Sequence, residues 1–309
     1  MRRQRAVLLM LVVTLLWSTA GVVTRHLEAA HGFELTFWRS AFNALALLLA
    51  LGWLRGAALW GQLRRAPRVV WASGFCWAVM FTAFMVALSL TRVANVLVTM
   101  ALGPLLTALF ARVFLRHRLP LRTWIAIAVA SIGVAWMFGQ DFRASPSAWL
   151  GMAVALGVPV AAALNWCLLQ HDAHGQEAAS DMPLAVLLGA LISVAVALPL
   201  AWPLQASAHD LGLLAGLGVF QLALPCLLVV RLARVLPGPQ LALLGQLELV
   251  FGVLWAWVGA GEVPSTAALV GGAMVLAALS ANELLGWRAN AAASSSPPTF
   301  ESRPSRSTA

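Results

Sequence analysis

The sequence has few charged residues, and two residue types are missing from it. Charged residues make up 10% of the 309 positions, and neither lysine nor tyrosine occurs, so all 20 basic residues are arginine. Soluble domains average roughly 25% charged and about 45–50% apolar residues, whereas this chain is 61% hydrophobic. Twenty basic and 11 acidic side chains are too few to cover the surface of a soluble protein of this size. We therefore expect an integral membrane protein.

Other absences narrow the function. Three cysteines, Cys76, Cys167 and Cys226, all fall inside apolar runs, and this odd number without a framework spacing argues against disulfides and against a zinc site. The sequence contains no GxxxxGK[ST] phosphate-binding loop. The six histidines lie in loops or at the ends of apolar runs. We expect no metal, no cofactor and no enzymatic activity.

The apolar runs are long enough to cross a bilayer many times. A hydrocarbon core about 30 Å thick requires roughly 20 apolar residues of helix. The sequence predicts ten such helices, at 6–24, 34–54, 69–90, 93–115, 122–139, 148–169, 183–203, 210–231, 239–258 and 265–285. Few runs alternate polar and apolar residues, which argues against a β-barrel. The remaining segment, 289–309, is small, polar and proline-containing, and we expect it to be a disordered tail.

The arginines predict the orientation. With the N-terminus in the cytoplasm, sixteen arginines lie on the cytoplasmic side, and only Arg25, Arg92 and Arg143 lie on the opposite side. This is a positive-inside bias, and it places both termini in the cytoplasm. Anionic lipid therefore explains the basic composition without any nucleic-acid partner. One alternative stays open at the N-terminus, where MRRQR, an apolar stretch and Ser18-Thr19-Ala20 also resemble a cleaved signal peptide.

Two stretches of the sequence are similar in character at an offset of 145 residues. They are NVLVTMALGPLLTALFARVFLRHRLP from Asn95 and QLALLGQLELVFGVLWAWVGAGEVPS from Gln240. Each begins with an amide, continues as an apolar helix with small residues and ends at a polar turn with proline. The repeat predicts two halves of five helices, 1–140 and 141–288. Because five is odd, the halves enter the membrane in opposite orientations, as is typical of secondary transporters with a substrate site at mid-membrane.

The order of short motifs along these helices resembles the drug/metabolite transporter superfamily, of the EamA type. The residues that carry the resemblance are Trp17-Ser18, Phe37-Trp38-Arg39, Pro104 within the fourth predicted helix, Gln221, Leu247-Glu248 and Gly261-Glu262-Val263-Pro264. The resemblance covers residues 6–285. It implies ten transmembrane helices in two inverted five-helix repeats, and the transport of small organic solutes, often outward. The chain departs from the family pattern at Arg116-His117, where a glycine and a glutamate are usual, and at Leu249, where proline is common.

Two charged residues inside predicted helices are candidate site residues, because charges are costly within a bilayer. Glu248 lies about nine residues into its helix, near the centre of the bilayer. Desolvation there favours its neutral form, so it could exchange protons or contact substrate, or it could instead link two helices. Arg39 could hold a substrate carboxylate with two hydrogen bonds. It could equally extend to the interface or pair with Glu34.

Neutral polar residues and prolines within the predicted helices complete the candidate site. Each polar side chain needs a partner from another helix, water or substrate. These candidates are Trp17, Ser18, Asn95, Thr99, Asn165, Gln221 and Gln246. Pro104, Pro159 and Pro225 each free a backbone carbonyl at mid-depth, and they are candidate hinges or static kinks.

These expectations predict a secondary active transporter in the cytoplasmic membrane, by family resemblance a bacterial inner membrane. Its substrate would be a small organic metabolite or drug, moved outward by alternating access, with protons as a candidate coupling ion. The alternative is a membrane-embedded enzyme or sensor that binds a metabolite or lipid without moving it. An intramembrane enzyme would cluster acids or histidines at one membrane face, and the sequence has no such cluster.

Overall fold

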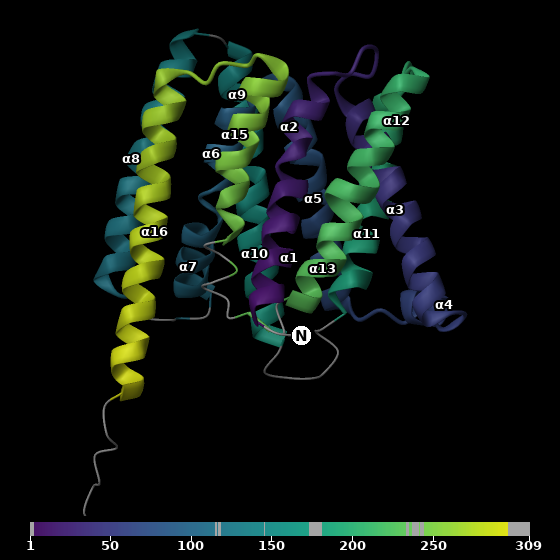
Figure 1. The fold of residues 1–309 in the computed structure, drawn as a ribbon. Coiled ribbons are helices and arrows are strands. Elements are labelled where there is room, and N and C mark those ends of the chain that lie inside the picture. Colours follow the sequence, from purple (N-terminus) through teal and green to yellow (C-terminus); the bar gives the residue numbers. More distant parts are fainter. Residues whose placement is uncertain are drawn as a thin grey trace, which may run out of the picture.

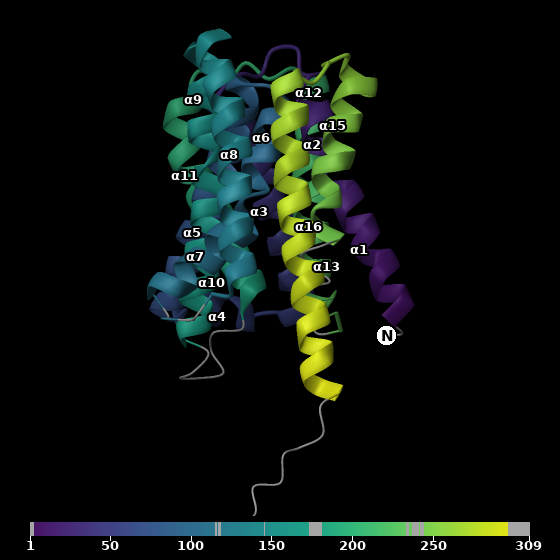
Figure 2. The same ribbon diagram turned by 90° about the vertical axis from the view of Figure 1, so that its left-hand side faces the viewer.

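The protein is a bundle of long helices that run side by side (Figure 1). The computed structural model describes residues 3–295 except 115, 117–118, 145, 173–180, 233–234, 237–240 and 242–243. Within these residues the regular secondary structure is helical and contains no strand. Figure 2 shows the same bundle from the side, with the chain start at the lower end. We call this the N-terminal end and the other the far end.

The first part of the chain contributes eight helical segments. They are α1 (Arg3–Trp17), α2 (Thr19–Thr24), α3 (Phe33–Arg55), α4 (Ala58–Arg64), α5 (Arg68–Leu90), α6 (Val93–Met100), α7 (Gly103–Phe114) and α8 (Leu121–Ala144). The pairs α1/α2 and α6/α7 are each one apolar stretch that is interrupted, at Ser18 and at Ala101-Leu102 respectively. These interruptions lie within candidate membrane spans, Gln4–Thr24 and Val93–Phe114.

The second part of the chain repeats this mixture of whole and interrupted helices. Its segments are α9 (Pro146–Ala155), α10 (Gly157–Asp172), α11 (Met182–Ala201), α12 (Ala208–Gly216), the π-helix η2 (Leu217–Ala223), α13 (Leu224–Leu232), α15 (Leu247–Ala260) and α16 (Thr266–Ser295). A turn at Leu156 separates α9 from α10. Helix α16 continues to Ser295, so residues 289–295 are helical rather than part of an irregular tail. Residues 296–309 of the predicted tail lie outside the described residues.

Nine helices in the described residues are long and apolar enough to cross a membrane. The ends of each candidate span lie within two residues of a span predicted from hydropathy, although α8, α10 and α16 continue beyond their apolar parts. The exception is the span predicted at 239–258. Its place is taken by the 14-residue apolar helix α15 (Leu247–Ala260), and several residues just before it are outside the described part of the chain. The protein is a multi-pass membrane protein.

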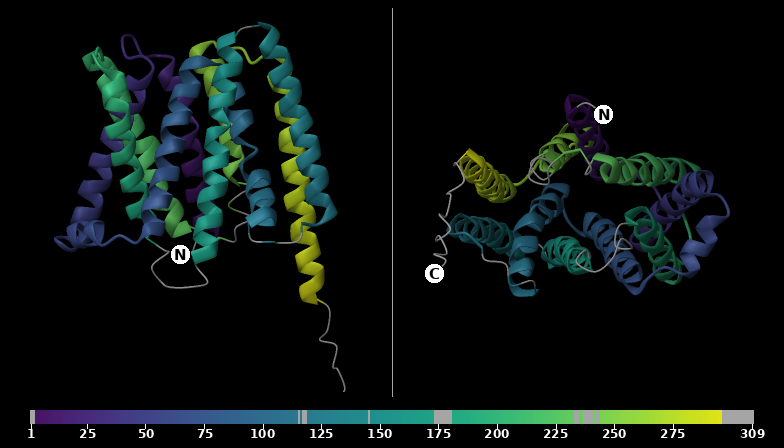
Figure 3. Two further views of the ribbon diagram at one scale, coloured as in Figure 1. Left: turned by 180° about the vertical axis from the view of Figure 1, so that it is seen from behind. Right: turned by 90° about the horizontal axis from the view of Figure 1, so that it is seen from below.

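The helices form two rows when the bundle is viewed from the N-terminal end (Figure 3, right). In one row α15 packs against α1 and α2, α1 packs against α13, and η2 packs against α3. In the other, α8 packs against α7, α7 against α10, α10 against α5, and α5 against α11. Contacts of α16 with α8, of α15 with α6 and of α3 with α11 join the rows. Each row therefore mixes helices from the two parts of the chain.

Glycines allow several of these helices to approach very closely. A Cβ at Gly189 of α11 would overlap Trp77 of α5, and one at Gly133 of α8 would lie 2.9 Å from the backbone oxygen of Gly271 in α16. Small residues at such contacts let helix backbones pack against each other, which drives helix association in membranes. Leu187, Leu188 and other buried aliphatic side chains fill the core around these contacts.

Candidate functional site

Arg39 lies within the bundle and not at its surface. It is the seventh residue of α3 and only 2% exposed. Its Nε and Nη2 atoms both donate hydrogen bonds to the side-chain oxygen of Gln221, at 3.2 and 2.8 Å, and its guanidinium carbon lies 5.3 Å from the centre of the Phe84 ring. Arg39 therefore neither extends to the interface nor pairs with Glu34, the two structural roles that the sequence left open. Glu34 instead accepts hydrogen bonds from Trp38 and from backbone at the far end.

The π-helix η2 positions Gln221 opposite Arg39. A π-helical segment widens a helix by one residue and is often found at functional sites. Gly218 lets this widened segment approach α3, because a Cβ there would lie 2.7 Å from the backbone oxygen of Arg39. The Gln221 amide nitrogen donates to the backbone oxygen of Trp17 at 3.1 Å, which turns the amide oxygen toward Arg39. The structure thus joins α1, η2 and α3 at one polar point.

Arg39 belongs to a polar face of α3 that the sequence analysis did not recognise. Thr36, Ser40 and Asn43 follow the spacing of helix turns around Arg39, and all three are at most 1% exposed. The Ser40 hydroxyl lies 3.0 Å from the hydroxyl of Ser193 on α11. The Thr36 hydroxyl and both polar atoms of the Asn43 amide are buried without a hydrogen-bond partner in the described residues. The spacing of these four polar residues in an apolar run was the signal that could have identified them.

This polar face is energetically costly. One charged residue in a membrane-spanning helix costs roughly 2.5–3.5 kcal/mol on insertion scales. The free Nη1 group of Arg39 and the unpaired Asn43 amide add about 1–3 kcal/mol each, because a buried polar group without a partner loses its hydration. Gln221 and the Phe84 ring offset only part of this cost. A stable fold that retains such a cluster therefore has a use for it.

A second polar point lies where the interruption of the first span contacts α15. The Ser18 hydroxyl accepts a hydrogen bond from Trp255 Nε1 at 3.1 Å. Helix α15 approaches closely here, because a Cβ on Gly252 would overlap Leu97 and would lie 3.5 Å from the Ser18 carbonyl oxygen. Glu248 is on the first turn of the same helix. It forms no ion pair with Arg39 at 4.0 Å or less.

The other predicted site residues lie apart from Arg39. Asn95 donates to the Thr91 hydroxyl, and Thr99 donates to the Asn95 backbone oxygen, all within or next to α6. Asn165 of α10 accepts a 2.6 Å hydrogen bond from Ser73 of α5. The Gln246 side-chain oxygen lies 3.5 Å from the Ser280 hydroxyl. The contacts of Asn165 and Gln246 link helices, which is the commonest role of polar residues in membrane bundles.

The three predicted hinge prolines all lie next to changes in helix geometry. Pro104 is the second residue of α7, just after the interruption at Ala101-Leu102. Pro159 is the third residue of α10, after the turn at Leu156, and Pro225 is the second residue of α13, directly after η2. Because proline lacks an amide hydrogen, it is tolerated at the first turn of a new helical segment.

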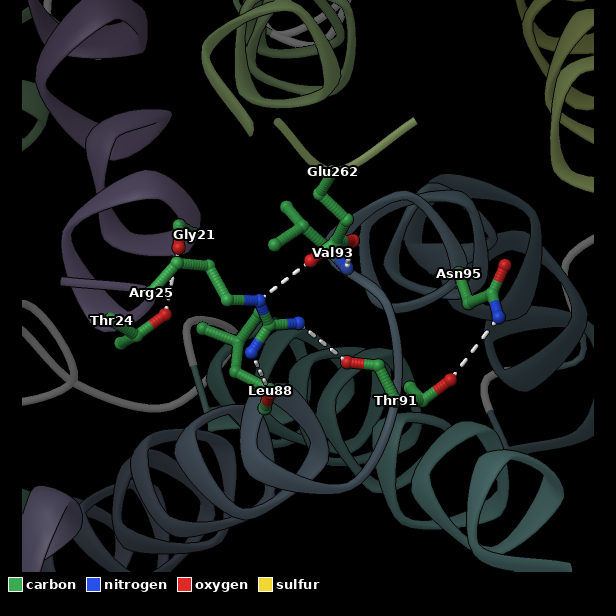
Figure 4. Close-up of polar contacts among 8 residues, drawn as sticks. All are labelled: Gly21, Thr24, Arg25, Leu88, Thr91, Val93, Asn95 and Glu262. Carbon is green, nitrogen blue, oxygen red and sulfur yellow. Dashed lines mark hydrogen bonds and ion pairs between the residues drawn. The ribbon is translucent and has the colours of Figure 1, made fainter. Parts of the chain in front are cut away.

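At the far end, Arg25 joins loops from both parts of the chain (Figure 4). Its Nε atom forms a 2.6 Å ion pair with Glu262, and its Nη1 and Nη2 atoms donate to the backbone oxygens of Leu88 and Thr91 at 2.6 and 2.7 Å. The second carboxylate oxygen of Glu262 accepts a hydrogen bond from the Val93 amide at 2.6 Å. We call these five residues the Arg25 clamp.

The backbone after α15 places Glu262 in the clamp. Gly261 ends this helix in the left-handed conformation, with φ of 65°, which glycine adopts without strain. The Glu262 amide then donates to the Ala256 oxygen, which closes a common C-terminal helix motif. The sequence analysis treated Glu262 only as a turn residue and did not pair it with Arg25. His117, which it placed at the other membrane face, lies outside the described residues.

Carboxylates also join the two parts of the chain elsewhere. At the far end, Glu34 at the start of α3 accepts hydrogen bonds from the amides of Gln205 and Ala206, which follow α11. At the N-terminal end, Asp181 at the start of α11 forms an ion pair with Arg55 at the end of α3, with two hydrogen bonds of 2.6 and 2.7 Å. Helices α3 and α11 are therefore tied together at both of their ends.

Asp210 makes the densest of these contacts. Its carboxylate is fully buried and accepts hydrogen bonds from the amides of Glu28, Ala29 and Ala30 at 2.8–2.9 Å, and from Ser207 at 3.3 Å. The first three amides belong to the loop between α2 and α3, so Asp210 holds this loop against the start of α12. Among the described residues, no group of three or more histidine, cysteine or acidic side chains could hold a metal ion.

Comparison with known proteins identifies the family. The EamA-like transporter family matches residues 4–139. Two relatives, the pseudopaline exporters CntI of Pseudomonas aeruginosa strains UCBPP-PA14 and PAO1, are each 24% identical over 79% of this chain and 84% of their own length. An uncharacterized transporter of strain PAO1 is also 24% identical, over 50% of this chain and 51% of its length.

The fold is also similar to a solved one. A crystal structure superposes on this chain with a TM-score of 0.61, covering 93% of this chain and 99% of the other at 22% identity. This likeness extends through both parts of the chain and shows a shared fold. The family match over residues 4–139 and the relatives named as transporters support an EamA-type member of the drug/metabolite transporter superfamily.

Proposed function

We propose that this protein is a secondary active transporter that exports small organic solutes across the cytoplasmic membrane by alternating access. Its ten spans form two inverted five-helix repeats, residues 1–140 and 141–288, with α15 and the residues before it as the ninth span. The observation that carries the proposal is the interruption of the fourth and ninth spans at matching positions. Ala101 follows α6 and Gln246 precedes α15, and positions 101 and 246 differ by the 145-residue offset of the sequence repeat. Interrupted helices at corresponding positions of two halves are typical of transporter binding sites.

The packing of the helices supports the same repeat. In the proposed repeat, each span corresponds to the span five places away along the chain. The contact of the ninth span (α15) with the first (α1/α2) therefore corresponds to the contact of the fourth span (α6/α7) with the sixth (α9/α10). In the same way, the contact of α5 with α11 corresponds to the contact of η2 with α3. Each of these two contacts includes a closely packed glycine, Gly189 in the first and Gly218 in the second. The α8–α16 and α3–α11 contacts each join a span to its own counterpart in the other repeat.

The site of this transporter is formed by Arg39, Gln221 and Glu248, near the interrupted first and ninth spans. Pro104, Pro159 and Pro225 act as hinges, at which helical segments move relative to each other. Glu248 is the residue through which protons act on transport. The relatives named as exporters support outward transport for this chain. The arginines Arg55, Arg64, Arg65 and Arg68 at the N-terminal end support cytoplasmic termini and a bacterial inner membrane location.

The test compares the spent medium of cells that express the protein with that of cells carrying an empty vector, by untargeted mass spectrometry. A solute enriched outside the expressing cells supports export, and the purified protein in sealed vesicles should then move it down an imposed gradient. Binding of that solute without any flux would instead indicate a membrane enzyme or sensor.

The role of Glu248 is tested with Glu248→Gln, which mimics the protonated carboxyl. We expect flux through this variant to lose its dependence on pH, while Glu28→Gln, an exposed carboxylate at the far end, keeps it. An unchanged pH profile in Glu248→Gln would remove Glu248 from the mechanism.

A further inference from the structure

The positive charge of Arg39 has no negative counterpart in contact with it. Among the described residues, the ion pairs are those of Arg25 with Glu262 and of Arg55 with Asp181. The partners of Arg39 are a neutral amide and an aromatic ring. A guanidinium stays charged at any physiological pH, and charged residues in membrane bundles pair with each other or mark the path of a substrate. Among the described residues, no acidic side chain within 4.0 Å balances the charge of Arg39, which leaves this role to a negatively charged group from outside the chain.

The hydrogen bonds of Arg39 leave one buried edge of the guanidinium without a partner among the described residues. Gln221 occupies the edge formed by Nε and Nη2. Nη1 has no partner, and each terminal nitrogen of a guanidinium carries two hydrogens, so the edge formed by Nη1 and Nη2 keeps one free donor on each nitrogen. Two parallel N–H groups on one edge match the two oxygens of a carboxylate. Because Gln221 is itself held by the Trp17 backbone, this edge is oriented before any ligand binds.

The surroundings of Arg39 supply further unpaired polar groups on the same face of α3. The Thr36 hydroxyl lies one turn before Arg39, and the Asn43 amide lies one turn after it. A hydroxyl and an amide both donate and accept hydrogen bonds, which suits polar groups next to a carboxylate, such as an amine or a hydroxyl. Three adjacent turns of one helix thus carry buried polar groups without partners in the chain.

We propose that Arg39 binds a carboxylate of the transported solute, and that the protein therefore moves organic acids or amino acids. This inference rests on the proposed transport function and names its class of solute. Arg39 holds the carboxylate by its Nη1–Nη2 edge, and Gln221 keeps the guanidinium in place. Asn43 and Thr36 contact the neighbouring polar groups of the solute and select among acids.

The test measures the melting temperature of the purified full-length protein in detergent. The probes are the standard L-amino acids, each compared with its C-terminal amide, and benzoate compared with benzamide. A ligand that binds only the folded state raises the melting temperature in proportion to its occupancy. We expect at least one acid to raise it and the matching amide, which lacks the charge, to leave it unchanged.

Variants separate binding from structure. Arg39→Gln should weaken binding of that acid at least tenfold, and Arg39→Lys should also weaken it, because an ammonium cannot present two parallel donors. The matched control is Arg231→Gln, on the exposed side of α13, which should bind as the wild type does. Without ligand, Arg39→Gln should melt at the same or a higher temperature than the wild type, because it removes a buried charge.

Three results would overturn the proposal. They are an acid that binds no better than its amide, binding that survives in Arg39→Gln, and a marked loss of stability in Arg39→Gln without ligand. The medium comparison separates this inference from the proposed function. If the exported solutes carry no carboxylate or other anionic group, transport stands and the carboxylate site does not. If nothing is exported but an acid binds through Arg39, the site stands and export does not.

Discussion

Removing the charge of Glu262 should open the far end of the bundle by weakening the Arg25 clamp. The clamp contains three hydrogen bonds from one guanidinium, at 2.6–2.7 Å, and one from the Val93 amide to the carboxylate. It connects the end of α2 and the α5–α6 turn, in the first part of the chain, to the turn after α15 in the second. In a transporter with alternating access, such a contact holds one end closed.

The strength of the clamp follows from its partial burial. Hydrogen bonds to charged groups contribute about 1.5–3 kcal/mol when buried, whereas exposed ion pairs contribute about 0–1 kcal/mol. The side chains of Arg25 and Glu262 are 26% and 16% exposed, between these limits. We therefore expect a coupling energy of about 2 kcal/mol, which corresponds to about a 30-fold change in the equilibrium between closed and open arrangements.

The assay is the labelling rate of a cysteine placed at Thr24, which is 9% exposed and lies directly beside Arg25. Cys76, Cys167 and Cys226 are replaced by alanine in this background. When opening is fast relative to labelling, the rate follows the open population. Arg25→Gln and Glu262→Gln should each raise it about 30-fold by the estimate above.

Two comparisons make this prediction refutable. The double variant should be labelled no more than a few times faster than either single one, because the same interaction is lost in each. Arg92→Ala, an exposed arginine at the same end, should label as the parent does. The reasoning fails if both single variants change the rate less than threefold, or if their effects multiply in the double variant.

Three further predictions concern stability. Gly189→Ala should lower the free energy of unfolding by about 1–3 kcal/mol because its methyl group would overlap Trp77, whereas Gly212→Ala, with open space around it, should be neutral or stabilising; equal melting temperatures would contradict this. Asp181→Asn should cost about 1 kcal/mol because it removes the ion pair to Arg55 while asparagine still caps α11, and it should lose its effect when measured in an Arg55→Gln background. Asp210→Asn should cost about 2–3 kcal/mol, because either orientation of the asparagine amide would point its NH2 group at the Glu28 or the Ala29 amide hydrogen; thermal unfolding of the variant and of the wild type checks this.

The sequence predicted the helices well and their interruptions poorly. Hydropathy located nine spans to within two residues because a helix in a membrane must extend as far as its apolar run. The turn at Ser18 and the π-helix at Leu217–Ala223 leave hydropathy unchanged, so no apolar pattern could indicate them. Prolines helped in part, since Pro104 and Pro225 lie just after an interruption and the π-helix respectively.

The site was predicted as separate residues and not as an arrangement. Arg39 and Gln221 were both candidates, because polar groups are rare in apolar runs, but they are 182 residues apart and only the packing of η2 on α3 brings them together. Arg25 and Glu262 are 237 residues apart, and each was interpreted only by its place at a membrane face. Pairing of this kind depends on which helices are neighbours, which composition does not determine.

The polar contacts of the bundle differ systematically between its ends and its interior. At the ends, Glu262, Asp210 and Asp181 have partners for both of their oxygens, and these partners come from another part of the chain. In the interior, Arg39 and Asn43 keep polar atoms without a partner among the residues that the structure describes. Folding alone would favour the opposite arrangement, because an unpaired group costs most where water is absent. A solute bound as proposed above would supply inside the bundle the partners that loops and side chains supply at its ends.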